Sequence, residues 1–138
     1  MKYILIILTL IFSLIGCNDN QTSVENHLYG TWEGIDSRSK PGVLVFKKDK
    51  TLLMNLGGWN VNEVKGAEIN WTIDIIKDPM HLDITLYHEG RVMIIPCIFK
   101  IINKNKTLFS CVFDNESRPS NFNLDPDMLI MLNRKINK

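Results

Sequence analysis

Two stretches of strict polar and apolar alternation constrain the fold of this chain more than any other feature. Every second residue is apolar in residues 68–75, and residues 81–87 repeat the pattern. A period of two places the apolar side chains on one face, so both stretches predict half-buried strands of an antiparallel sheet. Asp78-Pro79 separates them, and because proline does not extend a central ladder, this dipeptide predicts the turn.

The rest of the chain also favours strands over helices. No stretch after the N-terminal run shows a clear apolar period of 3.6 residues, so we expect little helix. Turns and polar hairpin tips separate the remaining apolar segments, which predict strands at 29–35, 43–47, 51–56, 91–102, 107–113 and 128–134. About eight strands at this spacing are typical of a sandwich or a barrel.

The composition is that of one globular domain with balanced charge. The chain has 138 residues, 16 Lys and Arg against 15 Asp and Glu, and 45% hydrophobic residues. A chain of this size buries enough surface for an ordinary core. Its formal net charge of +1 argues against nucleic-acid binding, which normally needs a strongly basic face.

The N-terminus has the pattern of a secretory signal. Lys2 precedes a run of Ile, Leu and Phe over residues 4–15, which only Thr9 and Ser13 interrupt. About twelve apolar residues are too few to span a hydrocarbon core of roughly 30 Å as a helix. We therefore expect residues 1–16 to be a signal peptide and not a transmembrane segment.

The end of this run, Leu14-Ile15-Gly16-Cys17, resembles the lipobox of bacterial lipoproteins. The resemblance implies cleavage before Cys17 and attachment of acyl chains, such as palmitate, through its sulfur and its amine. Two or three acyl chains give stable anchoring where one chain would be marginal. We therefore expect a lipoprotein of the bacterial cell envelope, in the outer membrane if there is one, with its domain facing the periplasm or the exterior.

Residues 17–27 are polar and contain no aromatic residue except His27, so we expect a flexible tether between the lipid and a domain over 28–138. Without residues 1–16 the chain has 15 basic and 15 acidic side chains. A neutral domain is expected to gain nothing from anionic headgroups, which leaves attachment to the lipid alone.

Two further features resemble lipocalin-like barrels. Gly30-Thr31-Trp32 lies in the first expected strand, and Arg134 ends the last one. The resemblance implies that Trp32 closes one end of the barrel and that Arg134 packs over its indole, a contact worth roughly 0.5–2 kcal/mol. We therefore expect an all-β, mostly antiparallel, lipocalin-like barrel of about eight strands.

A series of short motifs strengthens this expectation. They follow one another at residues 30–34, 78–84, 97–101, 107–111 and 118–122. In this order they resemble a family of small bacterial domains that is frequent in planctomycetes and often described as lipocalin-like. The resemblance spans about residues 28–136, and it implies a fold but no reaction.

Cys97 and Cys111 are expected on the two strands of the second hairpin. If its turn centres on Lys104, each cysteine is seven residues from the centre, and the two Cβ atoms are close enough for a disulfide. A turn centred half a residue later removes the match. Export to an oxidising compartment and lipidation of Cys17 favour the disulfide, and two buried free thiols are the alternative.

The sequence predicts no catalytic residue, metal or cofactor. Both hairpin cysteines share their strand faces with Phe and Ile and not with a base, so neither has the setting of a nucleophile. His81 and His88 are an odd number of residues apart, so they point to opposite faces of a strand and cannot share a metal. We therefore expect that the protein is not an enzyme.

The function expected from the sequence is that of a non-catalytic binding module. Either a small apolar ligand fills an interior lined by Trp71 and Phe99, or an envelope protein contacts Trp59 and Arg118, as for the small lipoprotein inhibitors of lysozyme. Trp59 lies in a long loop over residues 57–67, where it contacts a partner or plugs the barrel end. The alternative is a structural envelope component with a filled barrel and no ligand.

Overall fold

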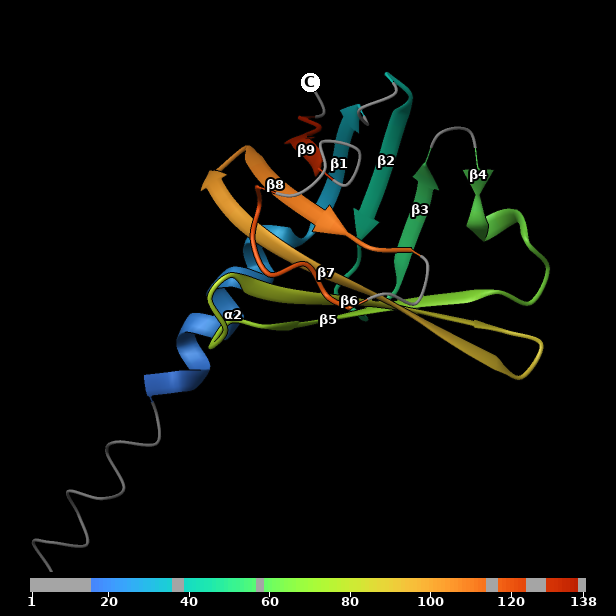
Figure 1. Ribbon diagram of the computed structural model, residues 1–138, viewed down its shortest axis with the longest axis horizontal. Coiled ribbons are helices and arrows are strands. Elements are labelled where there is room, and N and C mark those ends of the chain that lie inside the picture. Colours follow the sequence, from blue (N-terminus) through green and yellow to red (C-terminus); the bar gives the residue numbers. More distant parts are fainter. Residues whose placement is uncertain (1–15, 36–38, 57–58, 114–116, 124–128, 137–138) are drawn as a thin grey trace, which may run out of the picture.

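The computed structural model describes residues 16–35, 39–56, 59–113, 117–123 and 129–136, without the side chains of 16–18, 56 and 59. One antiparallel sheet curls into a nearly closed barrel, with a helix at one end (Figure 1). This confirms the expected all-β barrel of about eight strands, because one of the nine strands, at Trp59–Asn60, has only two residues.

The elements follow in the order α2 (Gly16–Leu28), β1 (Gly30–Ile35), β2 (Pro41–Phe46), β3 (Leu52–Leu56), β4 (Trp59–Asn60), the 3-10 helix η1 (Val61–Glu63), β5 (Glu68–Asp74), β6 (Met80–His88), β7 (Arg91–Asn103), β8 (Lys106–Cys111) and β9 (Leu129–Arg134). Asp78-Pro79 lies in the turn between β5 and β6, as the alternation predicts.

The spatial order of the strands is β4-β3-β2-β1-β9-β8-β7-β6-β5. The first and last long strands therefore lie side by side, with Trp32 of β1 opposite Arg134 of β9. The sheet closes on itself where β3 approaches β5: Thr51 bridges to Asn70, and the Trp71 amide donates to the Lys50 carbonyl oxygen at 3.0 Å. We refer to this junction as the seam.

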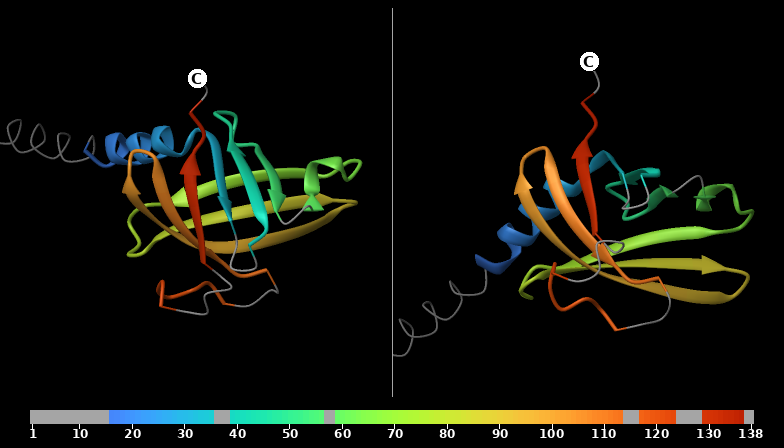
Figure 2. Two further views of the ribbon diagram at one scale, coloured as in Figure 1. Left: turned by 90° about the horizontal axis from the view of Figure 1, so that it is seen from above. Right: turned by 45° about the horizontal axis from the view of Figure 1, so that its top comes forward.

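The connections between strands fall at two ends of the barrel, because consecutive strands alternate in direction. The turns β2–β3, β5–β6 and β7–β8 lie at the end that carries α2 and the end of β9, which we term the helix end (Figure 2). The connections β1–β2, β6–β7 and β8–β9 lie at the opposite end, which we term the far end.

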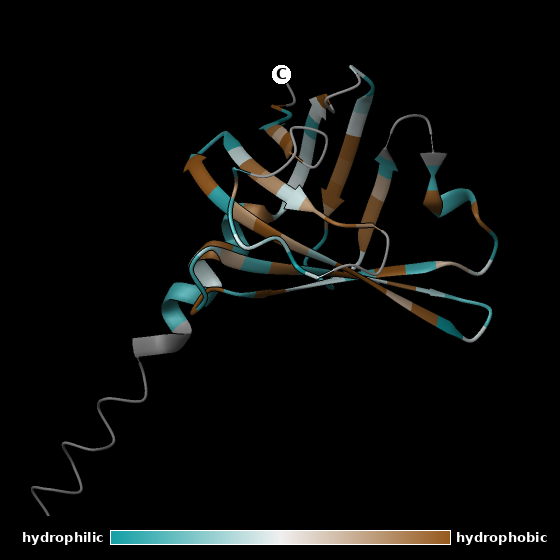
Figure 3. Ribbon diagram, in the orientation of Figure 1, coloured by the Kyte–Doolittle hydropathy of each residue, from teal (hydrophilic) through white to brown (hydrophobic). Residues whose placement is uncertain are grey.

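Apolar side chains that alternate along the strands pack together in the interior. The ribbon in Figure 3 is brown where the strands carry hydrophobic residues. The ring of Phe46 lies 5.2 Å from Trp71 and 6.2 Å from Phe109, and Phe109 lies 5.8 Å from Phe99. Such contacts between aromatic rings add to the stabilisation from burial alone.

The segment expected as a flexible tether, residues 17–27, is instead helical and belongs to α2. Leu28 is fully buried at the barrel end, and its carbonyl oxygen accepts a hydrogen bond from Trp32 Nε1 at 2.7 Å. Arg134 donates to the carbonyl oxygens of His27 and of Tyr29, the latter at 2.8 Å. These donors satisfy carbonyl groups at the helix C-terminus, so tertiary contacts stabilise a helix that its polar sequence does not predict.

Candidate functional site

Trp32 and Arg134 lie together at the helix end of the barrel. Trp32 is fully buried, and the guanidinium carbon of Arg134 is 4.4 Å from the centre of its ring. Gly30 allows this approach, because its φ of +115° suits glycine and an added Cβ would lie 3.3 Å from Arg134 Nη1. The arrangement is the one that the resemblance to lipocalin-like barrels implies.

His27 lies against the same pair. Its ring centre is 5.5 Å from that of Trp32, and Nε2 is 3.4 Å from Thr107 Oγ1. Burial, and then the positive charge of Arg134, lower the pKa of His27 below its ordinary value. Packing at this position therefore favours the neutral imidazole over the imidazolium.

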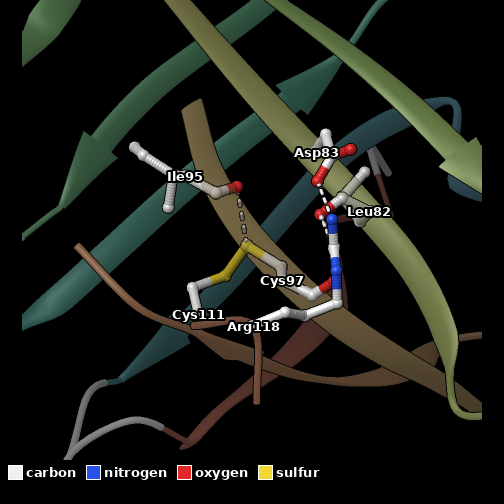
Figure 4. Close-up of a disulfide and its surroundings, with 6 residues drawn as sticks. All are labelled: Leu82, Asp83, Ile95, Cys97, Cys111 and Arg118. Carbon is white, nitrogen blue, oxygen red and sulfur yellow. Dashed lines mark hydrogen bonds and ion pairs between the residues drawn. A yellow bond between two sulfur atoms is a disulfide. The ribbon is translucent and has the colours of Figure 1, made fainter. Parts of the chain in front are cut away.

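Cys97 and Cys111 form a disulfide between β7 and β8 (Figure 4). The two residues are directly opposed, with Cα atoms 4.1 Å apart. Next to them, the Val112 amide donates to the Pro96 carbonyl oxygen at 3.3 Å. The cysteines therefore occupy a non-hydrogen-bonded pair, in which opposed residues approach most closely.

Arg118, expected to contact a partner, is bound within the chain instead. Its Nη1 donates to the carbonyl oxygens of Cys97 at 2.6 Å and of Leu82 at 3.3 Å, and its Nη2 forms an ion pair with Asp83 (Figure 4). The adjacent Pro119 is buried. Arg118 thus fastens the segment 117–123 to the barrel wall, and its contact with a partner stays a prediction.

Trp71 and Phe99, expected to line a ligand cavity, belong to the packed interior. Both are fully buried, so neither side chain is accessible to solvent. Lys50 Nζ lies 4.5 Å from the centre of the Trp71 ring and 2.5 Å from Glu25 Oε2. The Lys50 side chain therefore covers the indole of Trp71 at the seam. The described interior therefore offers these two residues no contact with a small ligand.

Trp59 and Cys17 are placed only by their backbone. Trp59 lies in β4, opposite Leu56, and its side chain is outside the described residues, so both interpretations of Trp59 stay predictions. Cys17 is the second residue of α2, and its side chain is likewise not described.

The described side chains do not gather into a metal-binding group: among them, no three His, Cys, Asp or Glu lie together as ligands would. Within the same part of the chain, no helix is long and apolar enough to cross a membrane.

The β6–β7 hairpin presents an apolar surface to solvent near the far end. Tyr87, Val92 and Ile94 are 43%, 59% and 53% exposed, and we name these three residues the hairpin patch. Tyr87 is directly opposite Val92, and Ile94 is two residues further along the same face of β7. Apolar residues that cluster in this way on a solvent-exposed surface, with a tyrosine among them, are typical of protein-binding sites.

The outer wall also has two open grooves. One, of about 660 Å³, runs over β1, β2 and β9 and is lined by residues that include Ile35, Val43 and Met131. The other, of about 380 Å³, lies over β2 and β3 beside Val45 and Leu53. Most of their lining residues, among them Ile35, Val43, Val45, Leu53 and Met131, lie on the outward faces of these strands.

Comparison with known proteins gives no further assignment. No protein-family model matches the chain, and no curated protein and no solved structure gives a significant match.

Proposed function

We propose that this protein is a lipid-anchored component of the bacterial envelope whose barrel is a non-catalytic module that binds another envelope protein. Cys17 carries the lipid in this proposal, and the hairpin patch is the surface that meets the partner. The lipobox resemblance supports the anchor, and the exposure of the hairpin patch supports the partner.

The observation that carries the proposal is the contrast between the interior and the wall of the barrel. The central aromatic side chains are fully or almost fully buried in contact with one another, whereas Tyr87, Val92 and Ile94 project from a wall strand pair into solvent. A filled interior favours a protein partner over a small apolar ligand, because such ligands need an apolar cavity on the order of a few hundred Å³.

A structural envelope component without a partner is the second candidate. The filled interior is as compatible with a structural component as with a protein-binding module. A purely structural role, however, gives no reason for three apolar side chains to stay exposed on one hairpin. The two candidates therefore differ in whether the hairpin patch is covered in the cell.

Site-specific photo-crosslinking in intact cells tests the proposal. A photoreactive amino acid replaces Val92 in the full chain, and a matched variant carries it at Lys100, which is exposed on the same face of the same strand. We expect one defined protein adduct from position 92 and none from position 100. Membrane-attached protein that gives no adduct at position 92 would favour the structural component.

A further inference from the structure

The helix end of the barrel is rich in lysine, although the chain as a whole is almost neutral. Its three turns, at residues 47–50, 75–79 and 103–106, contain six lysines and two aspartates. Lys47, Lys48, Lys77 and Lys104 are exposed there. These three turns therefore carry a net positive charge that the nearly neutral sum for the whole chain conceals.

Exposed isoleucines accompany these lysines. Ile76, next to Lys77, is 80% exposed, and Ile102, two residues before Lys104, is 45% exposed. Ile136 follows β9 at the same end and is 66% exposed. Apolar side chains beside basic ones are the combination that binds the interface of an anionic bilayer, where the lysines meet phosphates and the apolar groups enter the headgroup region.

The same end carries the segment that leads to the membrane. The apolar residues 4–15 lead directly into Gly16, where α2 begins. A helix of 13 residues is about 20 Å long, so the barrel stays close to the point of attachment. The ion pair of Glu25 with Lys50 and the hydrogen bond from Arg134 Nε to the Lys104 carbonyl oxygen, at 3.2 Å, fasten the surroundings of α2 to two of the lysine turns.

We propose that the helix end of the barrel binds the anionic surface of the bilayer in which the chain is anchored, through Lys47, Lys48, Lys77 and Lys104 with the exposed isoleucines beside them. The hairpin patch, near the far end, then points away from the bilayer. This inference rests on the membrane attachment of the proposed function, and it replaces the expectation that a neutral domain gains nothing from anionic headgroups.

Lysine footprinting of the full chain in vesicles tests this orientation. The chain is reconstituted into phosphatidylcholine vesicles with or without phosphatidylglycerol, and an amine-reactive acetylating reagent modifies the accessible lysines, which mass spectrometry then quantifies. We expect Lys47, Lys48, Lys77 and Lys104 to react about threefold or more slowly with phosphatidylglycerol present. Lys65, exposed between η1 and β5 towards the far end, is the internal control and should react equally in both.

A charge variant adds a second measurement. Replacement of Lys47, Lys48 and Lys104 by Gln should remove the protection of Lys77, whereas Lys65→Gln should leave that protection unchanged. Equal reactivity of the four lysines in both kinds of vesicle, with the protein still sedimenting with the lipid, would overturn the proposal. Protection that heparin produces with phosphatidylcholine vesicles, but phosphatidylglycerol does not, would assign the lysines to a soluble polyanion and also overturn it.

The vesicle result does not depend on lipidation in the cell. The full chain retains its apolar residues 4–15, which attach it to the vesicle whether or not Cys17 is acylated. Failure of the anchor in cells and failure of the orientation in vesicles are therefore separate outcomes.

Discussion

Cys97 and Cys111 are directly opposed because an irregularity in β7 offsets the position of the turn. The turn pairs Asn103 with Lys106, so its centre falls half a residue after Lys104. A regular ladder from that turn would leave the cysteines one residue out of register. A bulge between Ile101 and Asn103 shifts the pairing by one residue, and from Ile101 onward the register matches the cysteines.

The disulfide is expected to contribute about 3 kcal/mol to the free energy of unfolding, because it closes a loop with a sequence separation of 14 residues. The double variant Cys97→Ala, Cys111→Ala should lose this amount in denaturant titrations. Addition of a reductant should destabilise the wild type to a similar degree and leave the double variant unchanged. A double variant as stable as the oxidised wild type would contradict the prediction.

Replacement of Arg134 by Gln should destabilise both the barrel end and α2. The variant loses the cation over Trp32 and the donors to the carbonyl oxygens of His27 and Tyr29. We expect a loss of about 1–3 kcal/mol in denaturant unfolding, and faster hydrogen exchange of the α2 amides. Lys135→Gln is the control: the exposed side chain of this neighbour forms a surface ion pair with Glu33, and its loss should cost less than about 1 kcal/mol.

Arg118→Gln should release the segment that Arg118 fastens. Its guanidinium loses the hydrogen bonds to the carbonyl oxygens of Leu82 and Cys97 and the ion pair with Asp83. We expect protease cleavage within residues 117–123 to become several-fold faster, with the disulfide intact. Arg91→Gln, at an exposed arginine, should leave the cleavage rate unchanged.

His27 should make stability depend on pH. Its pKa in the folded chain lies below the ordinary value of 6.5, because burial and then Arg134 disfavour the imidazolium. As pH falls through about 6.5, the unfolded chain takes up the proton first, so stability falls until the folded form also titrates; above that range the contribution is constant.

The comparison of unfolding midpoints at pH 7.5 and 5.5 checks this dependence. His27→Gln should show a smaller decrease between the two pH values than the wild type does. The pKa of His81 is also lowered, by burial and then by Arg118, so the double variant with His81→Gln should show the smallest decrease. An unchanged decrease in both variants would exclude His27 and His81 as its origin.

Cys17→Ser tests the anchor. If the sulfur of Cys17 carries the lipid, the exported variant should move from the membrane fraction to the soluble fraction once residues 1–16 have been removed, when cells are fractionated at high salt. The wild type should label with a fatty-acid probe, and the variant should not. A variant that lacks residues 1–16 and still stays in the membrane pellet, or one that still labels with the probe, would count against lipidation of Cys17.

Most strands could be predicted because one of their faces is buried and the other faces solvent, which produces alternating apolar and polar residues in the sequence. The alternation in residues 68–75 and 81–87 corresponds to β5 and β6, with Ile69 and Trp71 inward as expected. Such patterns encode the fold locally, since each strand shows its own orientation in its own residues.

The helix α2 could not be predicted because its stability comes from distant residues. Val24 and Leu28 are its apolar contacts with the barrel, and their spacing of four residues was the signal present in the sequence. The groups that stabilise its C-terminus, Trp32 and Arg134, lie outside the helix, and Arg134 is more than a hundred residues away along the chain.

The hairpin patch and the lysine turns escaped sequence reasoning for a similar reason. Residues 92–95 are apolar without interruption, so no period distinguishes the outward Val92 and Ile94 from the inward Ile95. The three lysine turns are separate in sequence, and only the topology brings them to one end. A single net charge for the chain averages over that arrangement.

The seam between β3 and β5 determines where the barrel opens first. Among the described residues, its backbone connection consists of the Thr51–Asn70 bridge and the Trp71–Lys50 hydrogen bond, whereas the other long strands share full ladders. Thermal fluctuations should therefore separate β3 from β5 before they separate other paired strands. This opening makes the edge of β5 available to neighbouring molecules. Crowded or partly denaturing surroundings would thus start self-association of this protein at β5.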